Sequence, residues 1–517
     1  MTAAIVMALL APLAAAALLW TAGGGLPVAL WTDVLVYLLI AVMAGAAWYA
    51  SRREHLRAPW RRVAQSKSGM AALVVLSAFA VVGVLDSLHY RPALDRKDAK
   101  GDLVYGGEVL SLLDLAAAPL RASAERTYSA PFATRAYARE TIELADGKQS
   151  REFPRLKYGG AHLGDEAERD VDILIRGLRG FAAAFLLWWV LAGGIAVALS
   201  RRSARRAGAL WRDIWHGRTV VPWNVILLAG GAILALAGPT ATLGAHYHVL
   251  GTDKVGQDVL YLSLKSIRTG LVIGTLTTLV LLPLAVLLGI MAGYLRGWVD
   301  DLIQYLYTTL NSIPGVLLIA AAVLIMQVYI DGHPELFPTT AQRADLRLLF
   351  LCLILGLTSW TGLARLLRGE TLKLRELEYI QAAQAFGVGG ARIIARHILP
   401  NVMHLVLIAL VMDFSSLVLA EAVLSYVGVG VDPTMISFGT MINAARLEMA
   451  REPMVWWALF SAFAFMFALV LAANLFADAV RDAFDPRVRI SARSGPAPED
   501  AAGAAALTPA RAGAGGS

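Results

Sequence analysis

The amino-acid sequence predicts an all-α polytopic membrane protein, and its composition is the first reason. Hydrophobic residues make up 57% of the 517 positions, and charged residues make up only 16%. An average soluble domain carries about 25% charged residues. A chain this apolar exceeds what one aqueous core can bury, so most of its surroundings must be lipid. Helices are expected, because lipid offers no partner for unpaired backbone groups.

Ten apolar runs are the second reason, because each is long enough to cross a bilayer as a helix. They lie near residues 3–20, 29–50, 69–87, 181–199, 222–239, 270–295, 302–330, 347–367, 402–425 and 455–478. The first run lacks the basic segment with which a signal peptide begins, and a second run follows it directly. Both are therefore interpreted as retained spans.

Three loops rich in arginine and lysine, 51–67, 200–221 and 368–399, orient these spans. Short basic loops of membrane proteins stay in the cytoplasm. When all three loops are placed there, the ten spans alternate without contradiction, and both termini are expected to be cytoplasmic.

A polar segment, 88–172, separates the third and fourth spans and carries 13 basic and 15 acidic side chains. The same topology places it outside, and its length and aromatic residues predict a small folded module. The front of the chain is divided into two transmembrane helices with a basic cytoplasmic loop (1–67), a third transmembrane helix (68–87), an extracytoplasmic insert (88–176) and two further transmembrane helices (177–240). The Ala-, Gly- and Pro-rich tail, 491–517, is expected to be disordered.

The loop between the eighth and ninth spans is predicted to form a helical hairpin. Ala382, Ala383 and Ala385 leave a helix surface with little side-chain bulk, so another protein can approach closely. Gly387 supplies the backbone freedom for a turn. Pro400 suits the first turn of the next helix, where its missing N–H costs nothing.

This hairpin resembles the coupling loop of binding-protein-dependent ABC importer permeases, whose pattern is Glu-Ala-Ala, three residues, Gly, nine residues and Ile-x-Leu-Pro. Gln381 replaces the Glu, and His397 stands at the Ile position. The residues in register are Ala382, Ala383, Gly387, Leu399 and Pro400. The missing Glu removes a charge, which puts an ion pair to the ATPase at this spot in doubt.

Three further stretches resemble signatures of the dipeptide/oligopeptide branch. They are Leu250-Gly251-Thr252-Asp253-Lys-Val-Gly256-Gln-Asp258-Val259, Ala420-Glu421-Ala422-Val-Leu424-Ser425-Tyr-Val-Gly428-Val-Gly430, and Asn474-Leu through Arg481-Asp482-Ala-Phe-Asp485-Pro486-Arg487. With the hairpin, the ordered set covers about residues 248–490, and such a set is far more specific than any one motif.

The resemblance implies a type I ABC importer permease core at 241–490, built largely from the last five spans, with a cytoplasmic coupling loop at 368–400. The chain would be a transport subunit and not an enzyme, and it would hold no cofactor itself. Its partners would be a sister permease (a heterodimer), two ABC ATPases that use ATP and an extracytoplasmic substrate-binding protein. Its location would be the bacterial inner membrane. Permeases of this branch usually carry one span before the Gly-Thr-Asp segment, whereas this chain has five and an insert.

The resemblance also carries over the site residues. The ATPase-coupling residues are Glu378, Gln381, Ala382, Ala383, Gly387, Leu399 and Pro400, and the outer-surface signature consists of Gly251, Thr252, Asp253, Gly256 and Asp258. Asp253 and Asp258 are expected to cap and orient a helix rather than touch substrate. Asp413 and Glu421 lie inside the ninth span, where a carboxylate is costly and faces protein or a watery cavity. Both are candidates for the translocation path, with a structural pairing favoured for Glu421.

Several other functions are disfavoured by the sequence. No Gly-x4-Gly-Lys-Ser/Thr phosphate loop is present, and the histidines lack metal-ligand spacing. The single cysteine, Cys352, excludes an internal disulfide. The net charge of +7 lacks the aromatic–basic interleaving of nucleic-acid binders. A secondary transporter or an intramembrane enzyme is the alternative class, and an opine, a metal chelate or an antibiotic peptide is the alternative cargo.

Overall fold

The computed structural model describes residues 26–97, 103–143, 149–203, 206–333, 335 and 339–484. Two predictions concern residues outside this set: the first span, 3–20, and the disordered tail, 491–517. The remaining predictions fall within or overlap the described part of the chain.

Nine helical segments in the described residues are long and apolar enough to cross a membrane, and each overlaps one predicted span. They are α2 (Trp31–Arg52), α4 (Lys67–Asp86), α7 (Arg169–Ser203, preceded by a short turn), α9 (Trp223–Gly244), α10 (Val259–Leu295), α12 (Gly315–Gly332), α13 (Thr340–Ser359) continued by α14 (Thr361–Arg375), α16 (Gly390–Ile393) running into α17 (Leu399–Val427), and α19 (Trp457–Phe484). The prediction of an all-α polytopic membrane protein is confirmed.

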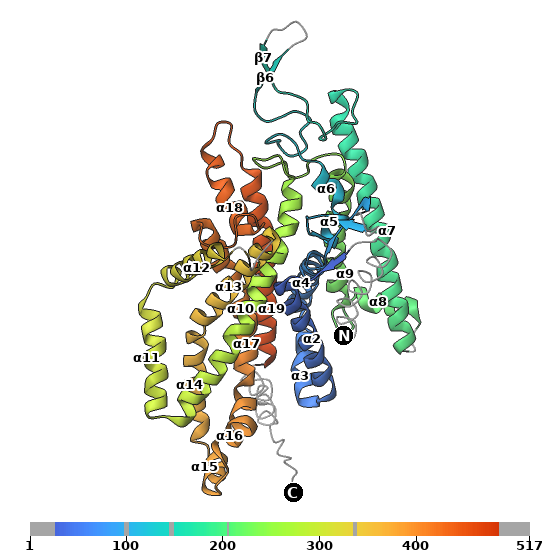
Figure 1. The fold of residues 1–517 in the computed structure, drawn as a ribbon. Coiled ribbons are helices and arrows are strands. Elements are labelled where there is room, and N and C mark those ends of the chain that lie inside the picture. The colour runs from blue at the N-terminus through green and yellow to red at the C-terminus, as the bar shows by residue number, and fades with distance from the viewer. Residues whose placement is uncertain are drawn as a thin grey trace, which may run out of the picture.

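The predicted single span at 302–330 is divided in the structure. Helix α11 (Trp298–Ser312) ends before Pro314, and α12 begins after it in a different direction (Figure 1). A proline pushes the preceding residue out of the helical region, and Ile313 is extended, with φ −93° and ψ 132°. Average hydropathy passes over such a break, because the strongly apolar α12 outweighs the more polar end of α11.

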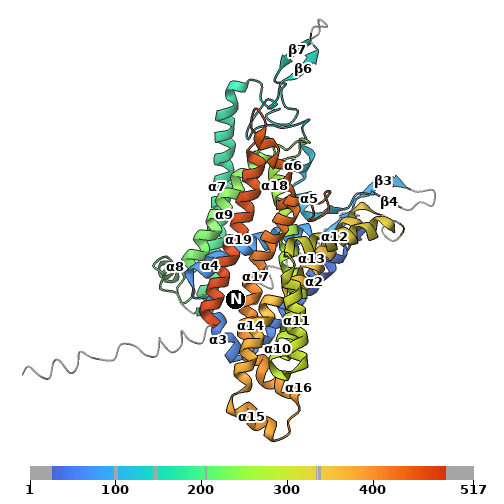
Figure 2. The same ribbon diagram turned by 90° about the vertical axis from the view of Figure 1, so that its left-hand side faces the viewer.

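Helix α10 is the central element of the bundle, and it packs against α13, α14, α17, α19 and α4. The C-terminal half of α10 shares a buried apolar cluster with α14, with the hairpin 376–399 and with the start of α17. Figure 2 shows the long helices side by side around it. Helix α4 packs against α10 and α19, whereas α7 and α9 pair with each other and reach the bundle through α4.

Short strands and helices make up the described part of the insert. Two strands of the insert, β2 (His89–Arg91) and β5 (Leu110–Ser111), form an antiparallel sheet in the order β1–β2–β5 with β1 (Leu26–Val28), which precedes α2. Two further antiparallel pairs are β3 (Ala93–Lys97) with β4 (Leu103–Tyr105) and β6 (Glu140–Glu143) with β7 (Gln149–Glu152). Helices α5 (Leu112–Ala116) and α6 (Ala118–Ala122) follow β5. Helix α7 begins at Arg169, inside the range expected for the insert.

The remaining helices are short connections. Helix α3 (Glu54–Val63) joins α2 to α4, α8 (Ala207–Trp215) joins α7 to α9, α15 (Glu378–Ala385) follows α14, and α18 (Phe438–Arg446) follows α17. The β6–β7 hairpin and α15 mark opposite ends of the molecule (Figure 1). We call these the insert end and the hairpin end.

Candidate functional site

The hairpin 376–399 protrudes from one end of the bundle (Figure 1) and is anchored there by three isoleucines. Ile380, Ile393 and Ile398 are fully buried in the cluster formed with α10 and α14. They lie on the inner side of α15, on α16 and in the turn that leads into α17. The hairpin is therefore held in one position by packing, while its outer surface is left uncovered.

Gly387 ends α15 in a left-handed conformation, with φ +72°. Its amide donates to the Gln384 carbonyl at 2.9 Å, and the Val388 amide donates to the Ala383 carbonyl at 3.1 Å. These two bonds define a Schellman motif, in which a left-handed residue satisfies the last carbonyls of a helix. A β-branched side chain resists this conformation, so the turn depends on glycine.

The outer surface of the hairpin combines small and polar side chains with a few exposed large ones, of which Phe386 is the most exposed. Gln381, Ala382, Ala385 and Glu378 are exposed, and Ala383 is half-buried. Phe386 is 87% exposed, directly before the glycine turn. The sequence reasoning did not single out Phe386; a bulky apolar residue next to a predicted left-handed glycine was the signal that could have found it.

Polar contacts join the hairpin to the end of α10. Arg375 donates to the Tyr294 carbonyl at 2.7 Å, and the Gln384 amide donates to the Tyr294 hydroxyl at 3.4 Å. Arg296 pairs with Glu376 at 2.6 Å on the surface. The hairpin, through Gln384 and Glu376, and the adjoining last residue of α14, Arg375, are thus joined to the end of α10.

Leu399 and Pro400 lie where the hairpin passes into α17. Leu399 is half-buried and opens the helix, and Pro400 occupies its first turn, where no backbone N–H is needed. The preceding turn, Ile394–Ile398, is wound as a π-helix, a local widening often found at functional sites.

The Gly-Thr-Asp segment lies at the insert end, and the insert covers it. Thr252 is fully buried; its hydroxyl accepts the Ser129 amide at 2.6 Å and donates to the Thr127 carbonyl at 2.9 Å. The Trp457 indole donates to the Thr252 carbonyl at 2.9 Å. We call the contact between residues 125–129 and 248–258 the insert–core clamp.

Asp258 caps α10 within this clamp. Its carboxylate accepts the amides of Leu260 and Tyr261 at 2.9 and 3.3 Å, and its other oxygen bonds His248 Nδ1 at 2.8 Å. The His248 ring also faces Glu125 at 3.5 Å. A buried histidine thus links the insert to the first turn of α10.

Two pKa shifts follow from this arrangement. Burial opposes a charge on His248, but the hydrogen bonds and charges of Asp258 and Glu125 outweigh it and raise its pKa to about 9. Burial likewise opposes the Glu125 carboxylate, yet His248 and the backbone amides of 157–159 lower its pKa to about 2. Both groups are therefore charged at neutral pH and stabilise each other.

Gly256 makes the closest approach in the clamp. It has φ +77°, and a Cβ there would lie 1.9 Å from the Glu125 carbonyl oxygen. The Glu125 amide donates to the Gly256 carbonyl at 2.9 Å. Asp253 accepts the amides of Val255 and Gln257 and shapes the loop from within. These residues fix the conformation of the core loop and its contact with the insert.

The two intramembrane carboxylates differ in their surroundings. Glu421 is buried and accepts the hydroxyls of Ser425 at 2.6 Å and Ser437 at 2.9 Å. Asp413 is half-buried, and no described side chain bonds its carboxylate. Glu421 thus has the structural partners that were favoured for it, and a role for Asp413 in the translocation path stays a prediction.

Sequence reasoning missed two ion-paired basic residues on α10, the buried Arg268 and the half-buried Lys265. Arg268 pairs with Asp33 of α2 at 2.7 Å, and Lys265 pairs with Asp86 of α4 at 2.7 Å. Asp114 of α5 approaches the same lysine. The charged residues at the edges of the apolar runs could have indicated ion pairs, but the two members of each pair lie far apart in the sequence. These pairs join the front of the chain to α10.

The described residues contain no group of three or more His, Cys, Asp or Glu side chains that could hold a metal ion. What the fold and the hairpin define is a polytopic membrane protein with an anchored hairpin whose outer surface is exposed. This is the architecture of a transport permease.

Comparison with known proteins agrees with this class. Residues 285–490 match the family described as "Binding-protein-dependent transport system inner membrane component". The oligopeptide transport system permease protein OppC of Mycobacterium tuberculosis is 34% identical over 242 residues, which are 47% of this chain and 77% of the relative. The glutathione transport system permease protein GsiD of Pectobacterium atrosepticum is also 34% identical, with 47% and 73% covered. The dipeptide transport system permease protein DppC of Bacillus subtilis is 28% identical, with 47% and 69% covered.

This chain therefore belongs to the binding-protein-dependent ABC importer permeases, in the dipeptide/oligopeptide branch. It is a multi-pass inner-membrane protein and a transport component. Helices α2, α4, α7 and α9 lie outside the range that the family model matches.

Proposed function

We propose that this chain is the membrane-spanning subunit of an ATP-driven peptide importer, and that the hairpin 376–399 receives the force of ATP hydrolysis. The observation that carries the proposal is the hairpin itself. Its inner side is anchored by buried isoleucines, while its outer side presents alanines and an 87% exposed Phe386. Such a surface is unfavourable in water and fits a groove on a partner.

The proposed mechanism is a rigid-body transmission. Two ATPases close on ATP, move the hairpins that they hold and shift the helix bundle between outward and inward access. ATP is bound by these partners and not by this chain. The Tyr294 contacts pass the movement from the hairpin to α10. A sister permease and an extracytoplasmic substrate-binding protein complete the assembly, and both termini face the cytoplasm.

A peptide is the proposed cargo because the named relatives are permeases for oligopeptides, dipeptides and glutathione, itself a peptide. Residues 241–490 are the proposed permease core. Helix α4 supplies the span that precedes the Gly-Thr-Asp segment in related permeases, since it packs directly on α10 and α19. Helices α7 and α9 with the insert are then additions between that span and the core.

The test is Gly387→Val in the assembled transporter. We expect peptide uptake to fall by about tenfold or more at normal abundance, because the substitution strains a turn outside the bundle. The matched control is Gly387→Asn, since asparagine tolerates the left-handed region and should retain most uptake. Unchanged uptake in Gly387→Val at equal expression would contradict the proposal. Purification of the chain without any ATPase would favour a secondary transporter instead.

A further inference from the structure

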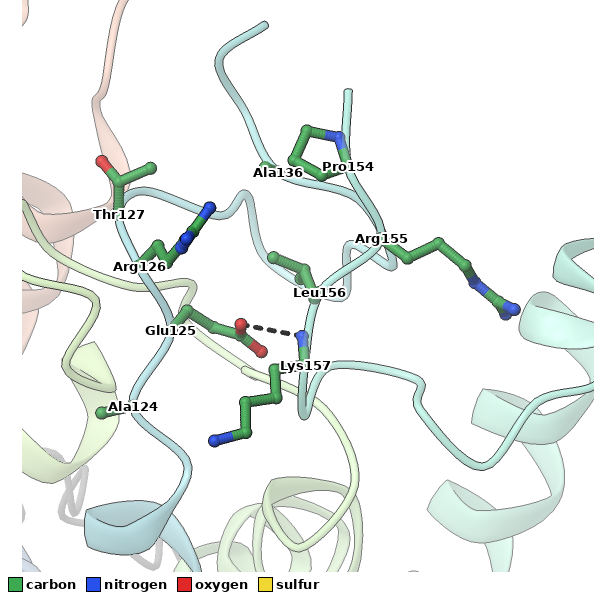
Figure 3. Close-up of a pocket in the computed structure, with 9 residues that line it drawn as sticks. All are labelled: Ala124, Glu125, Arg126, Thr127, Ala136, Pro154, Arg155, Leu156 and Lys157. Atoms are coloured by element: carbon green, nitrogen blue, oxygen red, sulfur yellow. Dashed lines mark hydrogen bonds between the residues drawn. The ribbon is translucent and has the colours of Figure 1, made fainter. Parts of the chain in front are cut away.

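Two neighbouring cavities open at the insert end and share Ala136 in their linings. The first, of about 450 Å³, lies between the loop segment that carries Glu125 and the loop segment that carries Lys157 (Figure 3). The second, of about 490 Å³, lies between the insert and the core loop around Arg451. We call the two cavities together the basic groove.

Basic residues outnumber acidic ones in the lining of the basic groove. The basic residues are Arg126, Arg135, Arg139, Arg155, Lys157 and Arg451, and the acidic ones are Glu125 and Glu452. Glu125 is already held by the amides of 157–159 and by His248 (Figure 3 shows the first of these bonds). Glu166 pairs with Arg135 and Arg155, and Glu448 pairs with Arg451, so three of the six cations are neutralised by acids beside the groove.

Two of these cations are exposed and lack an acidic partner among the described residues. The Lys157 ammonium lies 4.9 Å from the ring centre of Tyr158, and the Arg139 guanidinium lies 5.3 Å from that of Phe153. Both rings are themselves exposed. Aromatic rings beside arginine are typical of the energetic centres of protein interfaces.

The walls of the groove are fixed to the permease core. The Tyr137 hydroxyl donates to the Met454 carbonyl at 3.0 Å, and its ring packs edge-on against Trp457 with centres 4.8 Å apart. Arg451 lies over the ring of Tyr128 at 5.4 Å. A preformed surface loses little entropy when a partner binds.

We propose that the basic groove receives an acidic surface of the extracytoplasmic substrate-binding protein, an inference that rests on the proposed function. Exposed cations attract and orient an acidic partner, and the flanking rings add contact area. The floor of the groove continues into the insert–core clamp, which holds the first turn of α10. That helix spans Val259–Leu295, about 55 Å at 1.5 Å per residue, and ends at the hairpin. A binding protein docked at the groove would thus be connected to the proposed ATPase contact through a single helix, α10.

The experiment measures ATPase activity of the assembled transporter in proteoliposomes against the concentration of peptide-loaded binding protein. The probe is a purified extracytoplasmic peptide-binding protein from the same cell. In the double variant Arg139→Glu, Lys157→Glu, we expect the half-saturating concentration to rise by about tenfold or more, with basal ATPase activity and melting temperature unchanged. The rise should shrink at high salt, because exposed charges are screened.

Arg169→Glu is the control, since Arg169 is the first residue of α7, lies outside both cavities and pairs with an exposed neighbour, Asp170. It should leave the half-saturating concentration within about twofold. Arg139→Gln with Lys157→Gln is the milder pair if charge reversal prevents assembly, and it should still raise that concentration.

Three results would overturn the docking assignment. The first is an unchanged half-saturating concentration in an intact double variant. The second is an effect confined to the peptide concentration at saturating binding protein, which would assign the groove to the peptide itself. The third is an equal effect of Arg169→Glu. A wild-type complex that no binding protein stimulates would instead refute the proposed function, and the docking proposal with it.

Discussion

The insert–core clamp and the hairpin 376–399 lie at opposite ends of α10 and are built by opposite means (Figure 1). The clamp buries its polar groups and pairs them across the fold, as Thr252 does with Ser129. The hairpin forms from consecutive residues and leaves its outer side bare, with Phe386 87% exposed. The clamp residues therefore stabilise the folded chain, whereas the outward hairpin residues add little to it and are available for the proposed ATPase contact.

The largest effect that tests this comparison is expected for Gly256→Ala in the clamp. The new methyl group would lie 1.9 Å from the Glu125 carbonyl oxygen on a backbone with φ +77°, so the insert must move away. We expect the free energy of unfolding to fall by about 2 kcal/mol or more.

Thermal unfolding of the purified chain in detergent measures this loss. Gly107→Ala is the control, because Gly107 lies in the same insert and a Cβ there meets nothing within 4 Å. Equal melting temperatures for the two variants would contradict a stabilising role for the clamp.

A smaller effect, dependent on pH, is expected for His248. Its pKa of about 9 lies above the ordinary value of 6.5, so folding favours the protonated ring. The resulting stabilisation is complete below about pH 6.5 and is lost as the pH rises through about 9.

Melting curves of the wild type and of His248→Gln, recorded from about pH 6 to pH 10, give the test. The two should differ most at the acidic end of this range and converge toward the alkaline end. A difference that stays constant with pH would show that His248 acts through packing and not through its charge.

The smallest effect on stability is expected at the hairpin, in Phe386→Ala. The free energy of unfolding should change by less than about 0.5 kcal/mol, because the ring is solvent-exposed. Affinity for the ATPases should nevertheless fall by about fivefold or more, as for a central aromatic contact. Titration of purified ATPase measures this affinity. The control is Leu447→Ala, a change at another highly exposed apolar residue, which lies at the insert end. Equal affinities for these two variants would place the ATPase elsewhere.

The same contrast explains how much the sequence could predict. Hydropathy located nine described spans, because lipid imposes a length and a composition on each helix. The hairpin was readable because its determinants are local: small residues, then a glycine, then a proline at a helix start. The break at Pro314 was visible in the sequence as well, but a span defined by average hydropathy passes over it.

The clamp and the charge pairs on α10 were beyond such reasoning. Thr252 and Ser129 are 123 positions apart, and Arg268 and Asp33 are 235 positions apart. No sequence pattern around a single hydroxyl or carboxylate indicates a partner so far away in the sequence. The insert was expected to be a module of its own, yet Tyr128 shares a buried cluster with Val259 and Trp457 of the core.

Cross-linking from the hairpin tests the central claim most directly, namely that this element contacts the ATPases. The sequence has one cysteine, Cys352, and it is buried, so an added surface thiol is labelled selectively. Ala385→Cys carrying a thiol-linked photo-cross-linker should form an adduct with the ATPase in native membranes, and Leu447→Cys should not. Adducts with the ATPase from Leu447→Cys, or none from Ala385→Cys in an intact, active complex, would contradict the account.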